Sequence, residues 1–157
     1  MPFVHPKVLK IASIVRKWAE KKAKKEQGPS DLCGYCAIAS HRLHSALQNA
    51  GIKNSKIVYA HNHAYVKVGN RVIDVTATQF GHKKGVALGH EGKREYWPIE
   101  DTYSKDVLDR EEFTNPDSFI EHQEATGWPQ DQIAKPESPS FERMSVKELR
   151  ARSRKKT

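Results

Sequence analysis

The sequence predicts an α+β fold in which a helix headed by Cys36 packs on a small antiparallel β-sheet, with extra helices at the periphery. Apolar residues recur at helical spacing from Lys7 to Glu26 and again from Cys36 to Ala50. Short runs rich in valine, isoleucine and tyrosine follow, as is typical of strands. The chain has 157 residues, a usual size for one domain. We therefore expect one core and one site.

The two helices of the first half are defined by their ends. The first, Lys7–Glu26, carries lysines opposite its apolar stripe. It should end within Gln27–Asp31, because the glycine there suits a cap and the proline cannot continue a helix. The second helix, Cys36–Ala50, is closed by Gly51. Cys36 is therefore expected at a helix N-terminus.

Three strands are expected next, at Lys56–Ala60, His63–Val68 and Arg71–Val75. The last two are joined by Gly69-Asn70, which is typical of a two-residue hairpin turn. The result should be one strand followed by a tight hairpin.

That turn fixes which side chains of the hairpin meet. With a two-residue turn, Val66 faces Ile73 and His63 faces Thr76. His63 and Asp74 then share one face of the sheet as diagonal neighbours, roughly 7 Å apart at the backbone. Their side chains are therefore expected within hydrogen-bonding reach.

The second half of the chain carries weaker signals. Expected there are a loop over 81–93, a strand at Glu95–Ile99, a helix from Asn115-Pro116 to Ala125, a linker over Gln130–Ser140 and a last helix whose capping box starts at Ser145. We accordingly assign residues 1–130 to a single catalytic domain. Residues 131–157 form a linker and a basic C-terminal helix and tail.

The placement of Cys36, His63 and Asp74 predicts a nucleophilic site. A thiolate is the reactive form of cysteine, and the unpaired N–H groups at a helix N-terminus favour negative charge. A cysteine nucleophile also needs a histidine base, which in turn needs a carboxylate to orient it. We assign these three residues as a catalytic triad, with Tyr35 and Tyr65 as candidates for contacts with the substrate.

The residues around the triad resemble two families of cysteine enzymes. The run Cys33-Gly34-Tyr35-Cys36-Ala37 is similar to the papain-type nucleophile signature, whose second cysteine is catalytic, with alanine where an aromatic residue is usual. The wider order looks like the transglutaminase-like core, with Gly34-Tyr35-Cys36, Gly51-Ile52, His63-Ala64 and Asp74-Val75-Thr76 in the matching places. The resemblance covers residues 31–80.

This resemblance implies a papain/transglutaminase-like core and acyl transfer on peptide or protein amides, with no cofactor and no metal. Water as the acceptor gives a hydrolase, whether a thiol protease (cysteine peptidase), an amidase or a deamidase; an amine gives a transglutaminase. Papain-type enzymes place a glutamine six residues before the cysteine as a second oxyanion donor. Ser30 stands there in this chain, and Gln27 and Gln79 are alternatives by residue type.

Other uses of the same residues remain open. Cys33 and Cys36 with His61 and His63 would satisfy the tetrahedral preference of structural zinc, in a non-enzymatic basic module that binds nucleic acid. Cys33 could instead close a reversible disulfide with Cys36. A fold that keeps the triad but only binds its former substrate is a further alternative.

Charge and composition limit partners and compartment. Lysine plus arginine outnumber aspartate plus glutamate by 27 to 19, giving a net charge of +8, with clusters at Arg16–Lys25 and Arg150–Lys156. Such clusters can contact phosphate backbones, so a weak nucleic-acid contact through the basic helix and tail is one expected partner. The absence of a long apolar run, a signal sequence or a disulfide framework favours a cytoplasmic protein with no membrane partner.

Overall fold

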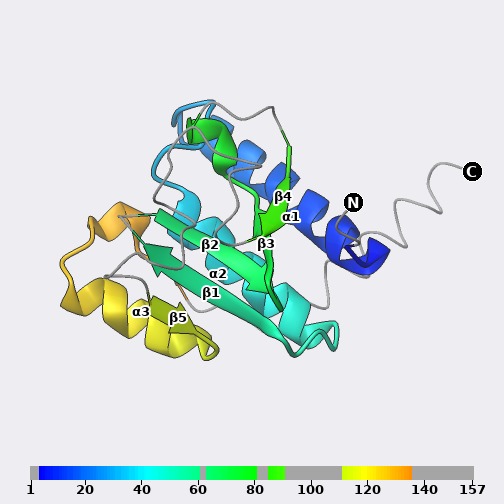
Figure 1. The fold of residues 1–157 in the computed structure, drawn as a ribbon. Helices are drawn as coiled ribbons and strands as arrows, with labels where there is room; N and C mark the ends of the chain where they lie inside the picture. The colour runs from blue at the N-terminus through cyan, green and yellow to red at the C-terminus, as the bar shows by residue number, and fades with distance from the viewer. Residues whose placement is uncertain (1–3, 61–62, 81–84, 91–110, 136–157) are drawn as a thin grey trace, which may run out of the picture.

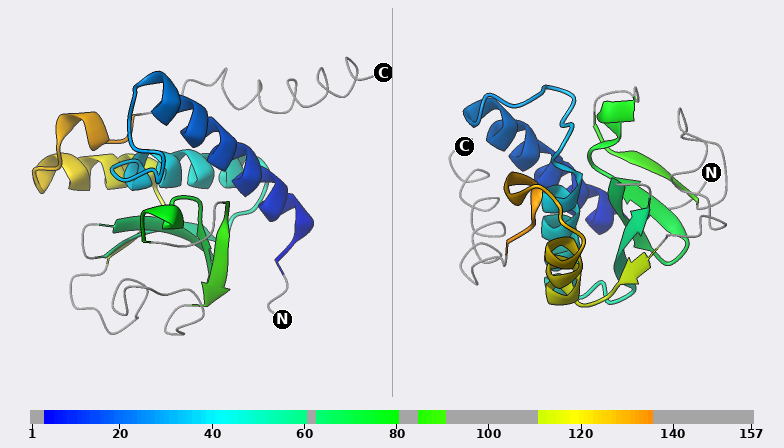
Figure 2. Two further views of the ribbon diagram at one scale, coloured as in Figure 1. Left: turned by 90° about the horizontal axis from the view of Figure 1, so that it is seen from above. Right: turned by 90° about the vertical axis from the view of Figure 1, so that its left-hand side faces the viewer.

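The computed structural model of the chain describes residues 4–60, 63–80, 85–90 and 111–135. These residues form an α+β fold with helices on one face of a five-stranded antiparallel sheet. Figure 1 shows the sheet crossed by α2, and the left view of Figure 2 shows the helices as one layer above the strands. The predicted fold class is confirmed at this level.

The helices are α1 (Pro6–Lys25), α2 (Cys36–Asn49) and α3 (Pro116–Ala125). The strands are β1 (Ser55–Ala60), β2 (His63–Val68), β3 (Arg71–Asp74), β4 (Ala87–His90) and β5 (Glu111–Phe113), in the sheet order β4-β3-β2-β1-β5. Two 3-10 turns, η1 (Ala77–Phe80) and η3 (Gln130–Gln132), follow β3 and α3. The bounds of α1, α2, α3, β1, β2 and β3 match the predicted elements to within about one residue.

The hairpin of β2 and β3 has the predicted register. Val66 pairs with Ile73 and Val68 pairs with Arg71. The apolar stripe of α2 packs on the face that carries Val66 and Ile73, and α1 packs beside α2. This packing brings the first residue of α2 to the end of the sheet where β2 begins and β3 ends.

Two features of the second half differ from the predictions. The segment 81–93 was predicted as a loop, and this is wrong for Ala87–His90, which forms β4 by pairing with β3. A four-residue strand that contains a glycine has almost no periodicity of its own, and the open edge of β3 decides its conformation. The predicted strand at Glu95–Ile99 and the helix from Ser145 lie outside the described residues.

The domain also continues past the predicted boundary at residue 130. Ile133 and Ala134, placed in the sequence within a linker, are buried against the cluster that contains Cys36 and Phe119. The backbone N–H of Ala134 donates to Oε1 of the buried Gln123 at 2.9 Å, which holds this segment against α3. Within the described ranges, no helix combines the length and apolar character needed to cross a lipid bilayer.

Candidate active site

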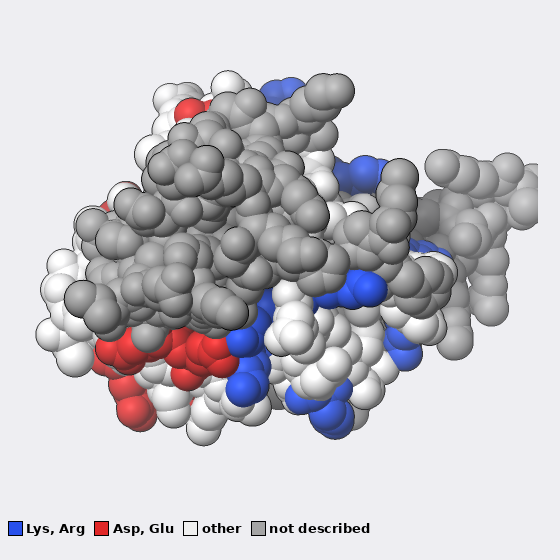
Figure 3. Space-filling model, in the orientation of Figure 1, with Lys and Arg blue, Asp and Glu red and all other residues white. Residues whose placement is uncertain are grey.

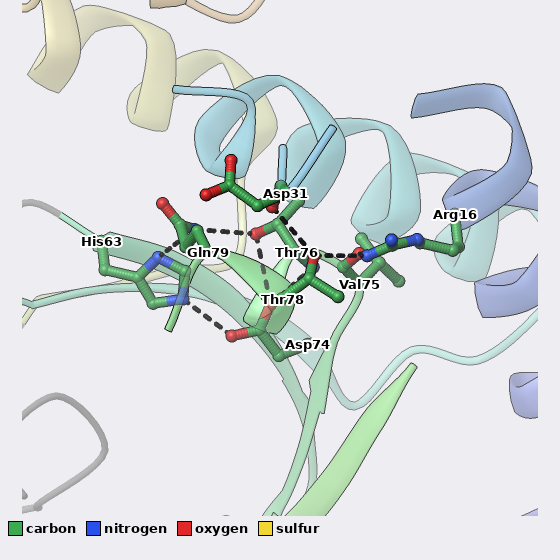
Figure 4. Close-up of polar contacts among 8 residues, drawn as sticks. All are labelled: Arg16, Asp31, His63, Asp74, Val75, Thr76, Thr78 and Gln79. Carbon is green, nitrogen blue, oxygen red and sulfur yellow. Dashed lines mark hydrogen bonds and ion pairs between the residues drawn. The ribbon is translucent and has the colours of Figure 1, made fainter. Parts of the chain in front are cut away.

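His63 and Asp74 meet in a buried corner of the sheet. Nε2 of His63 donates to Oδ2 of Asp74 at 2.7 Å, and the two side chains are only 2% and 1% exposed. The hairpin register produces this contact, because it puts the first residue of β2 and the last of β3 on the same face. Figure 4 shows the ring and the carboxylate pointing toward one another.

The second carboxylate oxygen of Asp74 is held by the turn that follows β3. The backbone N–H of Thr76 donates to Oδ1 at 2.8 Å, and its hydroxyl lies 3.3 Å from the same atom. A carboxylate that accepts several hydrogen bonds is fixed in place and in its charged form. Asp74 can therefore orient the imidazole of His63 and stabilise a positive charge on it.

Cys36 approaches His63 from the first turn of α2. The thiol is 4% exposed, and Cys36 lies near enough to the imidazole to contribute, after Asp74, to the raised pKa of His63. Because Nε2 is engaged by Asp74, Nδ1 is the nitrogen that can exchange a proton with the thiol. The structure thus brings together the three residues that the sequence assigned to the triad.

The charge state of His63 follows from these partners. Burial by itself lowers the pKa of an imidazole, but the negative charge and hydrogen bond of Asp74, together with Cys36, outweigh it and raise the pKa of His63 to about 10. The buried ring is therefore an imidazolium at neutral pH. A charged imidazole beside a cysteine side chain is the pairing that nucleophilic catalysis by cysteine uses.

Gln79 makes a further contact with the imidazole. Its Nε2 lies 3.2 Å from Nδ1 of His63 and 3.3 Å from the hydroxyl of Thr76. Gln79 sits on η1, which is held by Thr78: the hydroxyl of Thr78 donates to the carbonyl of Asp31 at 2.8 Å (Figure 4). The turn after Asp74 is thus connected to the loop that leads into Cys36.

Arg16 strengthens that connection from α1. Its guanidinium is buried and donates to the carbonyl of Val75 at 3.0 Å and to the hydroxyl of Thr78 at 2.9 Å. In the sequence, Arg16 belongs to the basic cluster Arg16–Lys25, and that pattern does not indicate this role. The spacing of apolar residues predicts which face of a helix a residue lies on, but not which distant backbone carbonyl its side chain will bind.

A small pocket lies in front of the nucleophile loop. Its volume is about 180 Å³, and its lining includes Tyr59, Trp128 and Gln132. A Cβ added to Gly34 would lie 3.3 Å from Nε2 of Gln132, so the carboxamide rests directly over the backbone two residues before Cys36. Tyr59 and Trp128 pack against the buried cluster that contains Cys36. The pocket therefore borders the buried cluster to which Cys36 belongs.

The sequence analysis did not find this pocket. Gln132 and Trp128 follow α3 and reach the site through packing across about a hundred positions of sequence, with no local motif to signal them. The two glutamines proposed from residue type are placed differently. Gln79 contacts His63, whereas Gln27 is exposed at the C-terminal end of α1.

The two tyrosines assigned to substrate contacts have other neighbours in the structure. Tyr35 is half-buried, and its hydroxyl donates to Oε1 of Glu26 at 2.9 Å, which ties the nucleophile loop to the end of α1. Tyr65 is fully buried, and its ring stacks on that of His63 with centroids 6.0 Å apart. Both therefore support the positions of triad residues, and a contact with substrate stays a prediction.

The zinc alternative is not decided by the structure. Cys33 is exposed and Cys36 is buried, both as free thiols, while His61 lies outside the described residues. Among the residues that are described, no three histidine, cysteine or acidic side chains converge as metal ligands would. Comparison of the chain with known protein families, curated protein sequences and solved structures finds no match. The papain/transglutaminase-like resemblance therefore stays a prediction.

Proposed function

We propose that this chain is a cysteine-dependent acyl-transfer enzyme that acts on peptide or protein amides through Cys36, His63 and Asp74. One observation carries the proposal: a buried imidazole lies between a fixed carboxylate and a thiol at the first position of a helix. A purely structural corner has little reason to bury a charged ring, because taking a charge out of water costs several kcal/mol unless it is well paired.

The chemistry follows from the positions of these groups. The thiolate of Cys36 attacks the amide carbonyl carbon, and a C–S bond forms while the carbonyl π electrons move to oxygen. The tetrahedral intermediate collapses as the C–N bond breaks, and Nδ1–H of His63 gives its proton to the departing amine. The product is a thioester on Cys36 and a neutral imidazole.

The second half of the reaction regenerates the thiol. Neutral His63 accepts a proton from an incoming water or amine, which attacks the thioester carbonyl; the C–S bond breaks and Cys36 leaves as thiolate. Water gives a carboxylic acid, as in a peptidase, amidase or deamidase, and an amine gives a new amide, as in a transglutaminase. Asp74 keeps the ring in the tautomer that presents Nδ1 to the sulfur throughout.

The oxyanion requires hydrogen-bond donors near Cys36. The first N–H groups of a helix have no partner within the helix, so the backbone N–H of Cys36 at the start of α2 supplies one. Gln132 is our candidate for the second, because its carboxamide lies over Gly34 and lines the adjacent pocket. No hydrogen bond within the described residues engages that carboxamide.

The test is the reactivity of the thiol. In a Cys33→Ser background, iodoacetamide should alkylate Cys36 rapidly at pH 6, where an ordinary cysteine is almost fully protonated. His63→Ala should slow the reaction by roughly 100-fold, while His5→Ala, at the exposed N-cap position before α1, should leave it unchanged. Slow alkylation that does not depend on His63 would refute the proposal.

Intact mass then separates an enzyme from a fold that only binds its former substrate. A small activated ester should add one acyl group to Cys36, and added water or amine should remove it over time. A stable acyl adduct that neither acceptor releases would show a nucleophile without turnover. The predicted cytoplasmic location is independent of this outcome.

A further inference from the structure

A second pocket lies where α1 meets the loop that leads to Cys36. Its volume is about 620 Å³, within the range of roughly 300–1,000 Å³ typical of ligand sites. Three lysines of α1, Lys17, Lys21 and Lys24, line one side. Their spacing of four and three residues puts them on one face of the helix. The opposite side is formed by the loop, including Ser30 and Leu32.

The charge of this pocket is positive and uncompensated. The three lysines are exposed, and none forms an ion pair with any residue that the structure describes. Glu20, the carboxylate among the lining residues, is engaged by Arg16, whose Nε lies 3.0 Å from Oε1. Three lysines therefore line the same concave surface, and among the described residues none of them has an acidic partner in an ion pair.

At β5, by contrast, acidic and basic groups neutralise one another. Figure 3 shows acidic side chains gathered over β5 and α3, with basic ones directly beside them. Glu112 of β5 pairs with both Lys56 and Lys67. The lysine pocket contrasts with this surface, because no ion pair to a described residue neutralises its three lysines.

The loop that lines this pocket is hydrogen-bonded to the turn that carries Gln79, a neighbour of His63. Its loop residues Ser30 and Leu32 flank Asp31, whose carbonyl accepts from Thr78, the neighbour of Gln79. Figure 4 shows Asp31 beside Gln79 and on the side of His63 that faces away from Asp74. A chain bound in the pocket thus lies along the loop that ends at the nucleophile.

We propose that this lysine pocket docks an acidic segment of the peptide or protein whose amide Cys36 attacks. The inference rests on the proposed function and adds a substrate class to it. Carboxylate side chains match the three ammonium groups, and a pocket of this size holds a few such side chains. Nucleic acid fits less well, because none of the described residues that line the pocket is aromatic and able to stack on bases, and three cations neutralise few phosphates.

The experiment uses a reactive peptide in the Cys33→Ser protein. The probe is a chloroacetyl-Gly-Gly-hexaglutamate peptide, and its neutral match carries six glutamines. In the reaction the thiolate of Cys36 forms a C–S bond as the C–Cl bond breaks and chloride leaves. We expect roughly tenfold faster alkylation by the acidic probe at low salt, since docking raises the local concentration of the electrophile. The advantage should shrink as salt screens the charges.

Two matched double variants test the lysines. Lys17→Gln with Lys21→Gln removes two charges from the pocket, and the advantage of the acidic probe should fall below about threefold. Lys10→Gln with Lys25→Gln removes two charges from exposed positions of the same helix that do not line the pocket. That control should keep most of the advantage. An equal loss in both variants, or no preference for the acidic probe, would overturn the inference.

Two further readouts separate this inference from the proposed function. Iodoacetamide reports the reactivity of the thiol alone. If iodoacetamide alkylates Cys36 rapidly and in a His63-dependent way, but the peptide probes show no preference for the acidic one, the docking site is refuted and the proposed chemistry is not. Fluorescence anisotropy of labelled hexaglutamate reports docking alone and needs no reactive thiol, so Cys36→Ala should bind it equally. A single-stranded oligonucleotide of equal charge that binds more tightly than hexaglutamate would favour nucleic acid and overturn the peptide assignment.

Discussion

Among the described residues, buried histidines lie in two places, and their pKa values are shifted in opposite directions. His63, at the triad corner, is 2% exposed, and His41 and His44, on the inner side of α2, are 2% and 0% exposed. The pKa of His63 is raised to about 10, whereas burial and the neighbouring His44 lower the pKa of His41 to about 4. Equal burial therefore gives opposite charge states, and the carboxylate of Asp74 makes the difference.

The contacts in the second place explain its neutral rings. His44 is satisfied by neutral partners, with the carbonyl of Thr114 at 2.6 Å from Nε2 and the hydroxyl of Ser55 at 2.9 Å from Nδ1. Nε2 of His41 is buried without a hydrogen-bond partner. Asp117 raises the pKa of His41, but less than burial lowers it. Between α2 and α3 the surroundings therefore favour neutral imidazoles, whereas the surroundings of His63 favour the protonated ring.

The two places should also respond to pH in opposite directions. A raised folded-state pKa means that the stability contributed by His63 is complete below about pH 6.5 and is lost as the pH rises toward 10. A lowered pKa means that His41 costs nothing above about pH 6.5 and destabilises the fold progressively as the pH falls toward 4. The fold is therefore weakened at both ends of the pH range by different histidines.

The largest effect is expected from Asp74→Asn, which removes the difference between the surroundings of His63 and those of His41. In Asp74→Asn the negative charge is gone, so burial should control His63 as it controls His41, and the ring should become neutral near pH 7. Alkylation of Cys36 by iodoacetamide at pH 6 should fall by about 100-fold or more, a change of two pKa units in the site. The rate would be measured from pH 5 to pH 9 in the Cys33→Ser background.

Asp31→Asn is the matched control for this loss. Asp31 lies in the same corner, but its carboxylate accepts from the backbone N–H of Cys33 at 3.0 Å and not from His63. It should leave the pH profile of alkylation in place. If both asparagine variants lowered the rate equally, general loss of negative charge would be responsible and the specific role of Asp74 would be lost.

The second effect tests the neutral imidazole of His41. At pH 5 an unfolded histidine with a pKa near 6.5 is protonated while buried His41 is not, which costs roughly 2 kcal/mol of folding free energy relative to pH 7. In His41→Leu this loss should disappear. Urea unfolding at pH 5 and pH 7 measures it, with His5→Leu as the exposed control. An unchanged pH dependence in His41→Leu would place the acid sensitivity elsewhere.

The triad corner could be predicted from the sequence because its determinants are local. The apolar spacing that starts at Cys36 defines the beginning of α2, and a two-residue turn after Val68 defines the register that joins His63 to Asp74. Each signal spans fewer than twenty residues. The contact between His63 and Asp74 is therefore a consequence of the hairpin, whereas the approach of Cys36 also needs α2 to pack on β2.

The surroundings of that corner could not be predicted, because they depend on packing between distant segments. Gln132 and Trp128 reach the site only after α3 has docked beside α2. The edge strand β4 forms because β3 offers it unpaired backbone groups, and the residues of β4 carry no strand pattern. The charges of His41 and His63 depend on which side chain lies opposite each ring. The periodicity of apolar residues in a helix or strand does not reveal that neighbour.

The third effect tests whether the site depends on the backbone conformation of Gly34 and on its contact with Gln132. Gly34 has a φ of +88°, and an added Cβ would meet the Gln132 carboxamide, whereas Gly51 has a φ of +89° with open space around it. Both glycine-to-alanine variants should lose about 1–2 kcal/mol of unfolding free energy through backbone strain. Gly34→Ala alone should also slow acylation of Cys36 by a small activated ester, roughly threefold or more. Equal acylation rates would show that the carboxamide of Gln132 plays no part.

The smallest effect concerns Gln79, which contacts the imidazole of His63 from the side opposite Asp74. Its Nε2 lies 3.2 Å from Nδ1 of His63 in the structure, and this contact is worth about 1 kcal/mol if it resembles an ordinary hydrogen bond. Because an amide N–H favours an unprotonated Nδ1, whereas the amide oxygen favours the imidazolium, the orientation of Gln79 biases the charge of the ring.

The variant Gln79→Ala should change the rate of Cys36 alkylation by roughly fivefold and move its pH profile, with Gln27→Ala as the exposed control. A profile shifted to higher pH means that the amide normally supports the deprotonated ring, and one shifted to lower pH means that the amide oxygen normally supports the imidazolium. A change in rate with no movement of the profile would assign Gln79 to packing, and Asp74 would then set the charge of His63 by itself.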